Sequence, residues 1–277
     1  RLARHLNGLG LSAPRVIGAD PTVGLALIED FGTATYGKLL GAGRDEKALY
    51  ELAIDALLHL HSAPTATAIT VPAYDVALIL DEVSIFSQWF VPVFAPLIDV
   101  VGFETTFRDL WGRALAPVLD APKALVLHDF HVDNLMLLDG RKGVLACGLL
   151  DFQDGVLGPA EYDLMSLLQD ARRDLADGLE DAMLRRYLDA APSSCGTEHT
   201  ILQRYHLLAA QRHTRLMGLF PRLNIRDNKS GYLNFMPRVA AQLRVAMRMA
   251  NLSEISDFLD TTLPGWCDAG PAMAKHP

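Results

Sequence analysis

Three polar side chains between residues 129 and 151 have the types and spacing of a phosphoryl-transfer site. Asp129 follows the apolar run 124–127, Asn134 comes five residues later, and Asp151 ends a second apolar run, 144–150. Phosphoryl transfer needs a carboxylate beside the attacking hydroxyl, and hard oxygen ligands for the Mg²⁺ ions that bridge the nucleotide phosphates. We therefore expect Asp129 to orient the hydroxyl, and Asn134 and Asp151 to bind metal.

Each of these residues also has a purely structural interpretation. An aspartate after a strand commonly caps a turn, so neither Asp129 nor Asp151 alone indicates catalysis. The spacing of the set favours the chemical interpretation. His131 is placed to donate to a phosphate oxygen, although a buried imidazole often bonds only to the backbone. Asp163, at the start of an apolar helix, is expected to cap that helix or to hold the catalytic loop from below.

The elements that must position these residues form a mixed helix and strand pattern. An amphipathic helix that ends near Gly8 or Gly10 precedes strands at 13–20 and 25–31. A nearly all-apolar helix, expected to be central and buried, follows from Asp45 to about residue 61. Further predicted elements are one or two helices over 74–101, a helix over 105–119, strands over 124–127 and 144–150, and helices over 163–175, 179–188, 201–220 and 236–249. This order resembles that of a kinase lower lobe after the tail of an upper lobe, which implies an α+β fold.

Composition limits the kinds of partner that the chain is expected to bind. Its 277 residues carry a formal charge of −8 with no basic stripe, which argues against nucleic acid and anionic membranes. Three distant cysteines show neither metal-ligand spacing nor a disulfide framework, which fits a reducing cytoplasm. The apolar stretch 76–103 is interrupted by acids and prolines, so we expect no membrane span. We expect a cytoplasmic monomer or weak dimer that acts on a small molecule.

Four longer motifs carry a resemblance to a known superfamily. They are residues 129–136 (Asp-Phe-His-x-x-Asn-Leu-Met), 148–154 (Gly-Leu-Leu-Asp-Phe-Gln-Asp), 162–172 (Tyr-Asp-Leu-Met-Ser-Leu-Leu-Gln-Asp-Ala-Arg) and 211–220 (Gln-Arg-His-Thr-Arg-Leu-Met-Gly-Leu-Phe). The chain resembles the aminoglycoside phosphotransferases and choline kinases over nearly its whole length, from residues 27–32 onward. Within that superfamily it looks like the bacterial anomeric kinases that phosphorylate N-acetylmuramate and N-acetylglucosamine at the C1 hydroxyl during cell-wall recycling.

The resemblance implies a protein-kinase-like fold with a truncated N-terminal lobe and a large, mainly helical C-terminal lobe. Residues 1–32 would be the remnant of the nucleotide-binding lobe and the hinge, and 33–277 the lobe with the catalytic loop and acceptor site. Two departures stand out. Leu127 occupies the position where most relatives have a histidine, and the phosphate-covering loop and strand lysine of the family are expected upstream of Arg1.

The resemblance also implies ATP and Mg²⁺ as cofactors. Adenine would lie against backbone groups of Glu29 and Phe31 at the hinge. Asp129 would be the catalytic base, and Asn134 and Asp151 would be the magnesium ligands.

The acceptor side is less sharply defined by the sequence. We expect acceptor contacts from 76–103, where Trp89 is a candidate sugar platform, and from the cluster 211–215, although clustered aromatics are usually core. The arginines at 172, 173, 212 and 215 would suit a sugar carboxylate, or simply form surface ion pairs. Two alternatives stay open: a kinase for another hydroxyl acceptor (aminoglycoside, choline or homoserine), and a nucleotide-binding pseudokinase. The apolar character of 76–103 argues against a polycationic aminoglycoside.

Overall fold

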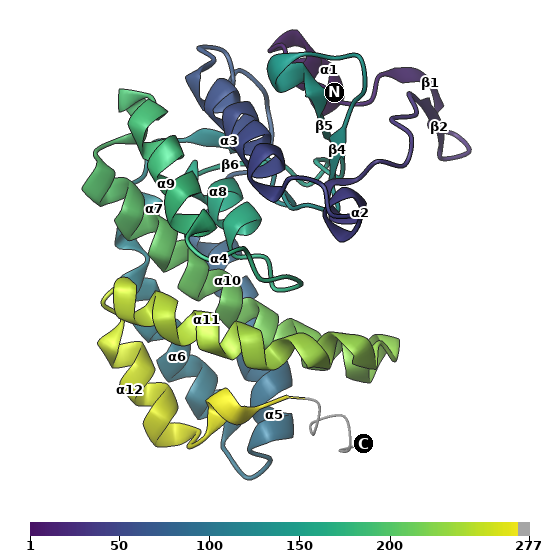
Figure 1. The fold of residues 1–277 in the computed structure, drawn as a ribbon. Coiled ribbons are helices and arrows are strands. Elements are labelled where there is room, and N and C mark those ends of the chain that lie inside the picture. The colour runs from purple at the N-terminus through teal and green to yellow at the C-terminus, as the bar shows by residue number, and fades with distance from the viewer. Residues whose placement is uncertain (271–277) are drawn as a thin grey trace. The chain divides into compact units, whose positions relative to one another are not determined.

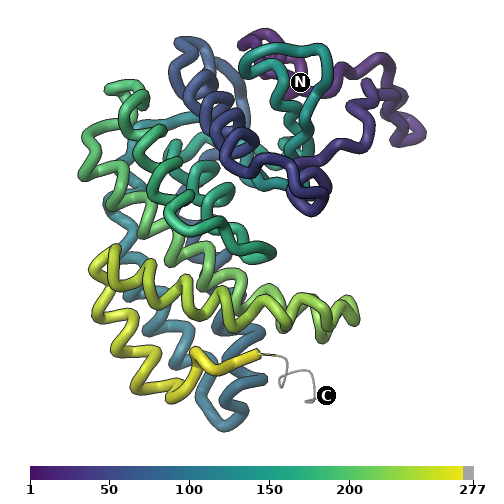
Figure 2. Tube along the Cα trace, in the orientation of Figure 1, coloured from purple at the N-terminus to yellow at the C-terminus, as the bar shows by residue number. Residues whose placement is uncertain are grey.

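The computed structural model describes residues 1–270 and groups them into two compact units. Unit 1 comprises residues 1–73, 122–170 and 175–198, and unit 2 comprises 74–121, 171–174 and the described residues from 199 onward. The repeated passage of the chain from one unit to the other can be followed along the tube in Figure 2. Among the described residues all strands belong to unit 1 and helices predominate in both units, so the fold is α+β, as predicted.

Unit 1 contains three small antiparallel pairs of strands. They are β1 (Val16–Asp20) with β2 (Leu25–Ile28), β3 (Ala124–Val126) with β6 (Val156–Gly158), and β4 (Leu135–Leu137) with β5 (Cys147–Leu149). The runs predicted at 124–127 and 144–150 do contain strands, but these two strands do not pair with each other. The prediction that the second strand starts at residue 144 was wrong: Gly143 has a φ of 56° and begins a 3₁₀ turn, Gly143–Ala146.

The helices of unit 1 are α1 (Leu2–Gly8), α2 (Tyr36–Gly41), α3 (Glu46–Ser62), α8 (Glu161–Leu168) and α9 (Leu179–Ala190), with a 3₁₀ turn at Ser193–Cys195. Helix α3 begins as predicted, since the Asp45 side chain accepts from the Ala48 amide at 3.1 Å. Figure 1 shows α3 beside α9, where Arg186 makes a two-pronged contact with Asp55 at 2.8 and 2.9 Å. Helix α8 stops well before the predicted residue 175, because the chain leaves unit 1 at residue 171.

Unit 2 is a helical assembly around a cluster of aromatic rings. Its helices are α4 (Val76–Ile85), α5 (Val91–Phe94), α6 (Val100–Ala114), α7 (Ala116–Leu119), α10 (Glu198–Asp227), α11 (Met236–Met249) and α12 (Ser253–Thr262), with a π-helical turn at Phe86–Phe90 and 3₁₀ turns at Ser230–Phe235 and Trp266–Asp268. Helix α10 begins in the last residue of unit 1. Phe86 stacks on Phe90 at 4.6 Å and lies 5.4 Å from Phe107 of α6. Phe90 is therefore core, whereas Trp89 is half-buried.

Helices α4 and α5 join through the π turn into one helical run, Val76–Phe94. Within residues 1–270 it is the one helix that meets the length and hydropathy of a membrane span. The run also carries the fully buried Phe86 and Phe90, and the buried Glu82, whose carboxylate accepts hydrogen bonds from Tyr74 and Gln211. A core helix with a satisfied buried carboxylate accounts for the apolar composition of this run.

Candidate active site

The loop that carries Asp129 begins with a strained turn centred on His128. The Asp129 amide donates to the Leu127 carbonyl at 3.0 Å, and His128 between them has a φ of 75°. A three-residue turn of this hand is rare for a residue with a side chain, and the surrounding structure must hold it in place.

The buried carboxylate of Asp163 supplies that restraint. Its Oδ2 accepts from the Leu127 amide at 2.6 Å and its Oδ1 from the His128 amide at 2.9 Å, so each oxygen holds one side of the turn. Complete burial raises the pKa of Asp163 to about 6, although the two amides and the His128 charge act to lower it. The expectation that Asp163 holds the catalytic loop is confirmed, and its role is positioning.

The four residues that were predicted to bind or act on the nucleotide phosphates, Asp129, His131, Asn134 and Asp151, lie together in unit 1. Asn134 Nδ2 donates to the Asp129 carbonyl at 3.0 Å and lies 3.5 Å from Asp151 Oδ2. It also lies 3.2 Å from Nε2 of His131, which is buried against the amide. Asp151 is exposed, with a φ of 56°, while Asp129 and Asn134 are half-buried. The backbone carbonyl of Asp129 and the carboxylate of Asp151 therefore flank an amide whose position is fixed.

The oxygen donors of this cluster fit Mg²⁺. The amide nitrogen of Asn134 is committed to the Asp129 carbonyl, which leaves the Asn134 amide oxygen as the ligand atom. One oxygen of Asp151 accepts from Gln153 at 2.5 Å, and the carboxylate is open to solvent. In the described part of the chain no group of three or more His, Cys, Asp or Glu side chains gathers as a metal site. Two protein oxygens, completed by phosphate oxygens and water, are the arrangement that Mg²⁺ commonly adopts with nucleotides.

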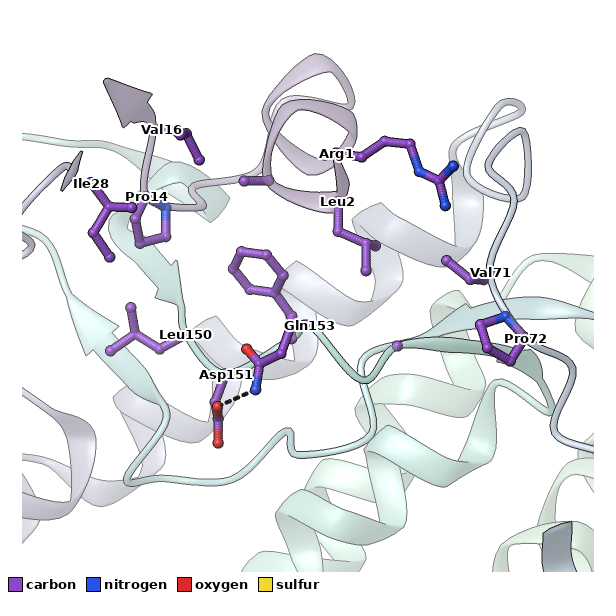
Figure 3. A pocket seen from close by; sticks show the side chains of 13 residues that line it. Arg1, Leu2, Pro14, Val16, Ile28, Val71, Pro72, Leu150, Asp151 and Gln153 are labelled. Carbon is purple, nitrogen blue, oxygen red and sulfur yellow. Dashed lines mark hydrogen bonds between the residues drawn. The ribbon is translucent and has the colours of Figure 1, made fainter. Parts of the chain in front are cut away.

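A cavity of about 480 Å³ in unit 1 opens beside Asp151. Figure 3 shows Asp151 and Gln153 on one side of it, with Pro14, Val16 and Ile28 across from them. This volume is within the usual range of small-molecule sites, about 300–1,000 Å³. Sequence reasoning did not foresee the apolar wall, because Val16 and Ile28 read only as ordinary strand residues.

The predicted adenine-binding residues, Glu29 and Phe31, follow β2 and do not line that cavity. The Glu29 amide is already used, since it donates to the Arg15 carbonyl at 2.8 Å. Burial acts to raise the pKa of the Glu29 carboxyl, but hydrogen bonds and charge from Arg15 and Arg141 hold it below its usual range. Within residues 1–270 the Phe31 amide donates no hydrogen bond to the protein, so it is available for a ligand.

In the segment predicted to contact the acceptor, Glu82 is the centre of a buried network in unit 2. Its Oε2 accepts from Tyr74 and from Gln211, each at 2.9 Å, and its Oε1 lies 3.6 Å from Nε of Arg215. Sequence reasoning named Glu82 and the 211–215 cluster, and it underestimated the helix that carries the cluster. The predicted helix stopped at residue 220 because Pro221 follows, whereas α10 continues through it to Asp227.

Comparison with known proteins agrees with this geometry. The sequence pattern of the phosphotransferase enzyme family matches residues 1–196. The chain belongs to this family. It is 38% identical over 273 residues to an N-acetylmuramate/N-acetylglucosamine kinase of Caulobacter vibrioides, covering 95% of this chain and 73% of that protein. A Neisseria meningitidis protein of the same name is 34% identical over 263 residues, covering 90% and 75%.

Solved structures show that this phosphotransferase has the protein-kinase-like fold predicted from its motifs. A choline/ethanolamine kinase family protein from Mesorhizobium loti aligns with a TM-score of 0.58 at 16% identity, over 95% of this chain and 81% of that one. An ADP-bound aminoglycoside phosphotransferase aligns with a TM-score of 0.56 at 17% identity, over 90% and 81%. The family and fold predictions are therefore confirmed.

Proposed function

We propose that this phosphotransferase transfers the γ-phosphoryl group of Mg²⁺-ATP to the anomeric hydroxyl of N-acetylmuramate and N-acetylglucosamine. The observation that carries the chemistry is the cluster of Asp129, Asn134 and Asp151, on a loop whose first turn is held by Asp163. The acceptor is proposed from the relatives, two of which bear that name at 38% and 34% identity. A cytoplasmic place in cell-wall recycling, as a monomer or weak dimer, belongs to the same proposal.

Each residue has a distinct role in this proposal. Asp129 orients the sugar hydroxyl and takes its proton as the bond to phosphorus forms. Asn134 and Asp151 hold Mg²⁺, which neutralises charge on the phosphates when it is bound. His131, whose Nε2 lies 3.2 Å from the Asn134 amide nitrogen, contacts a phosphate oxygen of the nucleotide. The Phe31 amide binds the adenine edge, with Glu29 beside it.

The proposed domain roles follow the predicted boundaries. Residues 1–32 contribute the hinge to nucleotide binding, and residues 33–277 contribute the catalytic loop and the acceptor site. The compact units divide the chain elsewhere, but they describe packing rather than roles.

An ADP-release assay tests the proposal, with N-acetylmuramate, N-acetylglucosamine, choline and kanamycin offered in parallel to protein of the complete natural sequence. We expect turnover with the two amino sugars alone, giving a phosphate that is stable in alkali and labile in acid. Turnover with choline or kanamycin instead would replace the acceptor assignment. ATP binding without turnover of any acceptor would favour a pseudokinase.

Two variants separate the roles of the aspartates. Asp129→Ala should lower kcat by about 10²–10⁴-fold and leave nucleotide affinity nearly unchanged. Asp151→Ala should weaken Mg²⁺-ATP binding itself, measured by titration calorimetry. Asp133→Ala, an exposed carboxylate on the same loop, is the control. Equal and small effects of the first two variants would contradict the assigned roles.

A further inference from the structure

We infer that Arg141 is a positioning residue that keeps the base-binding end of the nucleotide site at a fixed distance from the metal-binding end. The inference rests on the proposed function, in which the Phe31 amide binds the adenine edge while Asn134 and Asp151 hold Mg²⁺. ATP must reach both ends at once, so its affinity depends on how firmly they are joined. All the residues concerned belong to unit 1.

The two proposed metal ligands stand at the open end of one β-hairpin. Asn134 directly precedes β4, and Asp151 follows β5 by two residues. The two segments are joined there, because the Leu150 amide donates to the Asn134 carbonyl at 2.9 Å. Arg141 lies at the other end of the hairpin, in the turn that follows β4. A displacement of this hairpin would therefore move both metal ligands together.

The guanidinium of Arg141 joins this turn to the residues on either side of the β1–β2 pair. Its Nη1 donates to the Ser12 hydroxyl at 2.8 Å, and its Nη2 donates to Oε1 of Glu29 at 2.8 Å. Ser12 is fully buried, and its hydroxyl donates to the Leu145 carbonyl at 2.7 Å. The Glu29 side chain is 17% exposed, and Arg15 holds its second oxygen at 3.0 Å. Arg141 therefore binds two partners that are themselves fixed.

The ring of Phe31 lies against the same hairpin. The Arg141 guanidinium is placed over this ring, 5.1 Å from its centre. A Cβ on Gly148 of β5 would lie 2.9 Å from the Phe31 ring, so the ring packs directly on the backbone of that strand. Arg141 and Gly148 together restrain the residue whose amide is proposed to bind adenine.

The separation of the two ends is what these contacts fix. The ion pair of Arg141 with Glu29 is partly exposed, and such pairs add little to the stability of a whole protein. Two linked binding sites, in contrast, bind a two-part ligand more tightly than either part only while their separation matches the ligand. Loss of Arg141 should therefore weaken binding of the whole nucleotide more than binding of adenosine or of a triphosphate alone.

Binding measurements on the wild type and Arg141→Ala test the inference, in protein of the complete natural sequence. We expect Kd for Mg²⁺-ATP, from titration calorimetry, to rise about 10- to 100-fold, the range found when a residue that supports a metal site is lost. The inhibition constants of adenosine and of Mg²⁺-tripolyphosphate, from competition with ATP, should each stay within about twofold. KM for ATP should rise with Kd, while KM for the amino sugars should not. Lys142→Ala, which removes the neighbouring exposed charge from the same turn, is the matched control.

Glu29→Gln separates positioning from charge. This variant weakens the same contact but removes a negative charge, whereas Arg141→Ala removes a positive one, so a purely electrostatic effect on the phosphates would have opposite signs in the two. We expect both variants to raise Kd for Mg²⁺-ATP, Glu29→Gln by less. Shifts of opposite sign, an equal loss of affinity for adenosine or tripolyphosphate alone, or an unchanged Kd for ATP would overturn the inference. Absence of ATP binding or of turnover in the wild type would instead overturn the proposed function.

Discussion

Replacing Asp163 by asparagine tests how the fold positions the catalytic loop. The carboxylate uses Oδ2 for the Leu127 amide and Oδ1 for the His128 amide. Asparagine has one acceptor oxygen, and its amino group would face the second donor. One side of the turn at His128 would therefore lose its restraint while the side-chain volume stays nearly the same.

Two opposing terms set the effect of this change on stability. One amide left without an acceptor in a buried position costs about 1–3 kcal/mol. The second term has the opposite sign. Burial raises the pKa of Asp163 from 3.8 to about 6, so the ionised carboxylate destabilises the folded protein at neutral pH. At about 1.4 kcal/mol per pKa unit this cost is about 3 kcal/mol, and the neutral asparagine removes it. The two terms nearly cancel, so the free energy of unfolding should change little.

Activity has no such compensation. The turn at His128 sets the direction of Asp129, and a displacement of about 1 Å at a reacting group costs about a hundredfold in rate. We expect Asp163→Asn to lower kcat about 10- to 100-fold with the melting temperature nearly unchanged, measured by ADP release and calorimetry on the same preparation. Asp139→Asn, an exposed carboxylate in the turn after β4, is the control. A large fall in melting temperature with an unchanged kcat would refute the positioning role.

Three further predictions follow from buried groups. Gly218→Ala should destabilise unit 2 by about 1–3 kcal/mol in denaturant unfolding, because its Cβ meets the Ile85 carbonyl, whereas Gly112→Ala, with open space around it, should not. Burial lowers the pKa of His61 to about 4, so the stability that the neutral imidazole contributes is lost as the pH falls below 6.5. At pH 5 the loss is about 2 kcal/mol. The melting temperature of His61→Gln should therefore change less between pH 7 and pH 5 than that of the wild type. The raised pKa of Asp163 has the opposite effect on stability: the contribution of this residue grows as the pH falls from about 6 to 4. Protonation also removes one of the acceptors that hold the turn at His128, so kcat of the wild type should fall below pH 6.

The sequence predicted which residues gather around Asn134, because the signals there are local. Asp129, Asn134 and Asp151 lie within 23 residues, each next to an apolar run, and the loop between them folds on itself. The long helices were equally accessible, since α3 and α11 have caps or sustained apolar periodicity. In these segments local propensity and tertiary packing favour the same structure.

The missed elements are short or depend on distant contacts. Strands β4 and β6 have three residues each, too few for alternation to show, and they are held by pairing with β5 and β3. The length of α10 was underestimated at Pro221, because sequence rules end helices at proline. The apolar wall of the cavity beside Asp151 likewise joins segments from opposite ends of unit 1.

Backbone geometry marks the same site independently of any motif. Among residues 1–270, four residues other than glycine have positive φ: His128, Asp151, Asn228 and Asn251. Asparagine and aspartate tolerate this region, so His128, which forms the tight three-residue turn, is the one that needs a compensating structure. At His128 the compensation is visible, since Asp163 accepts both adjoining amides. At Asp151 the same geometry costs little and leaves the carboxylate exposed, in contact with Gln153 and Asn134, where it is open to the metal that it is proposed to hold.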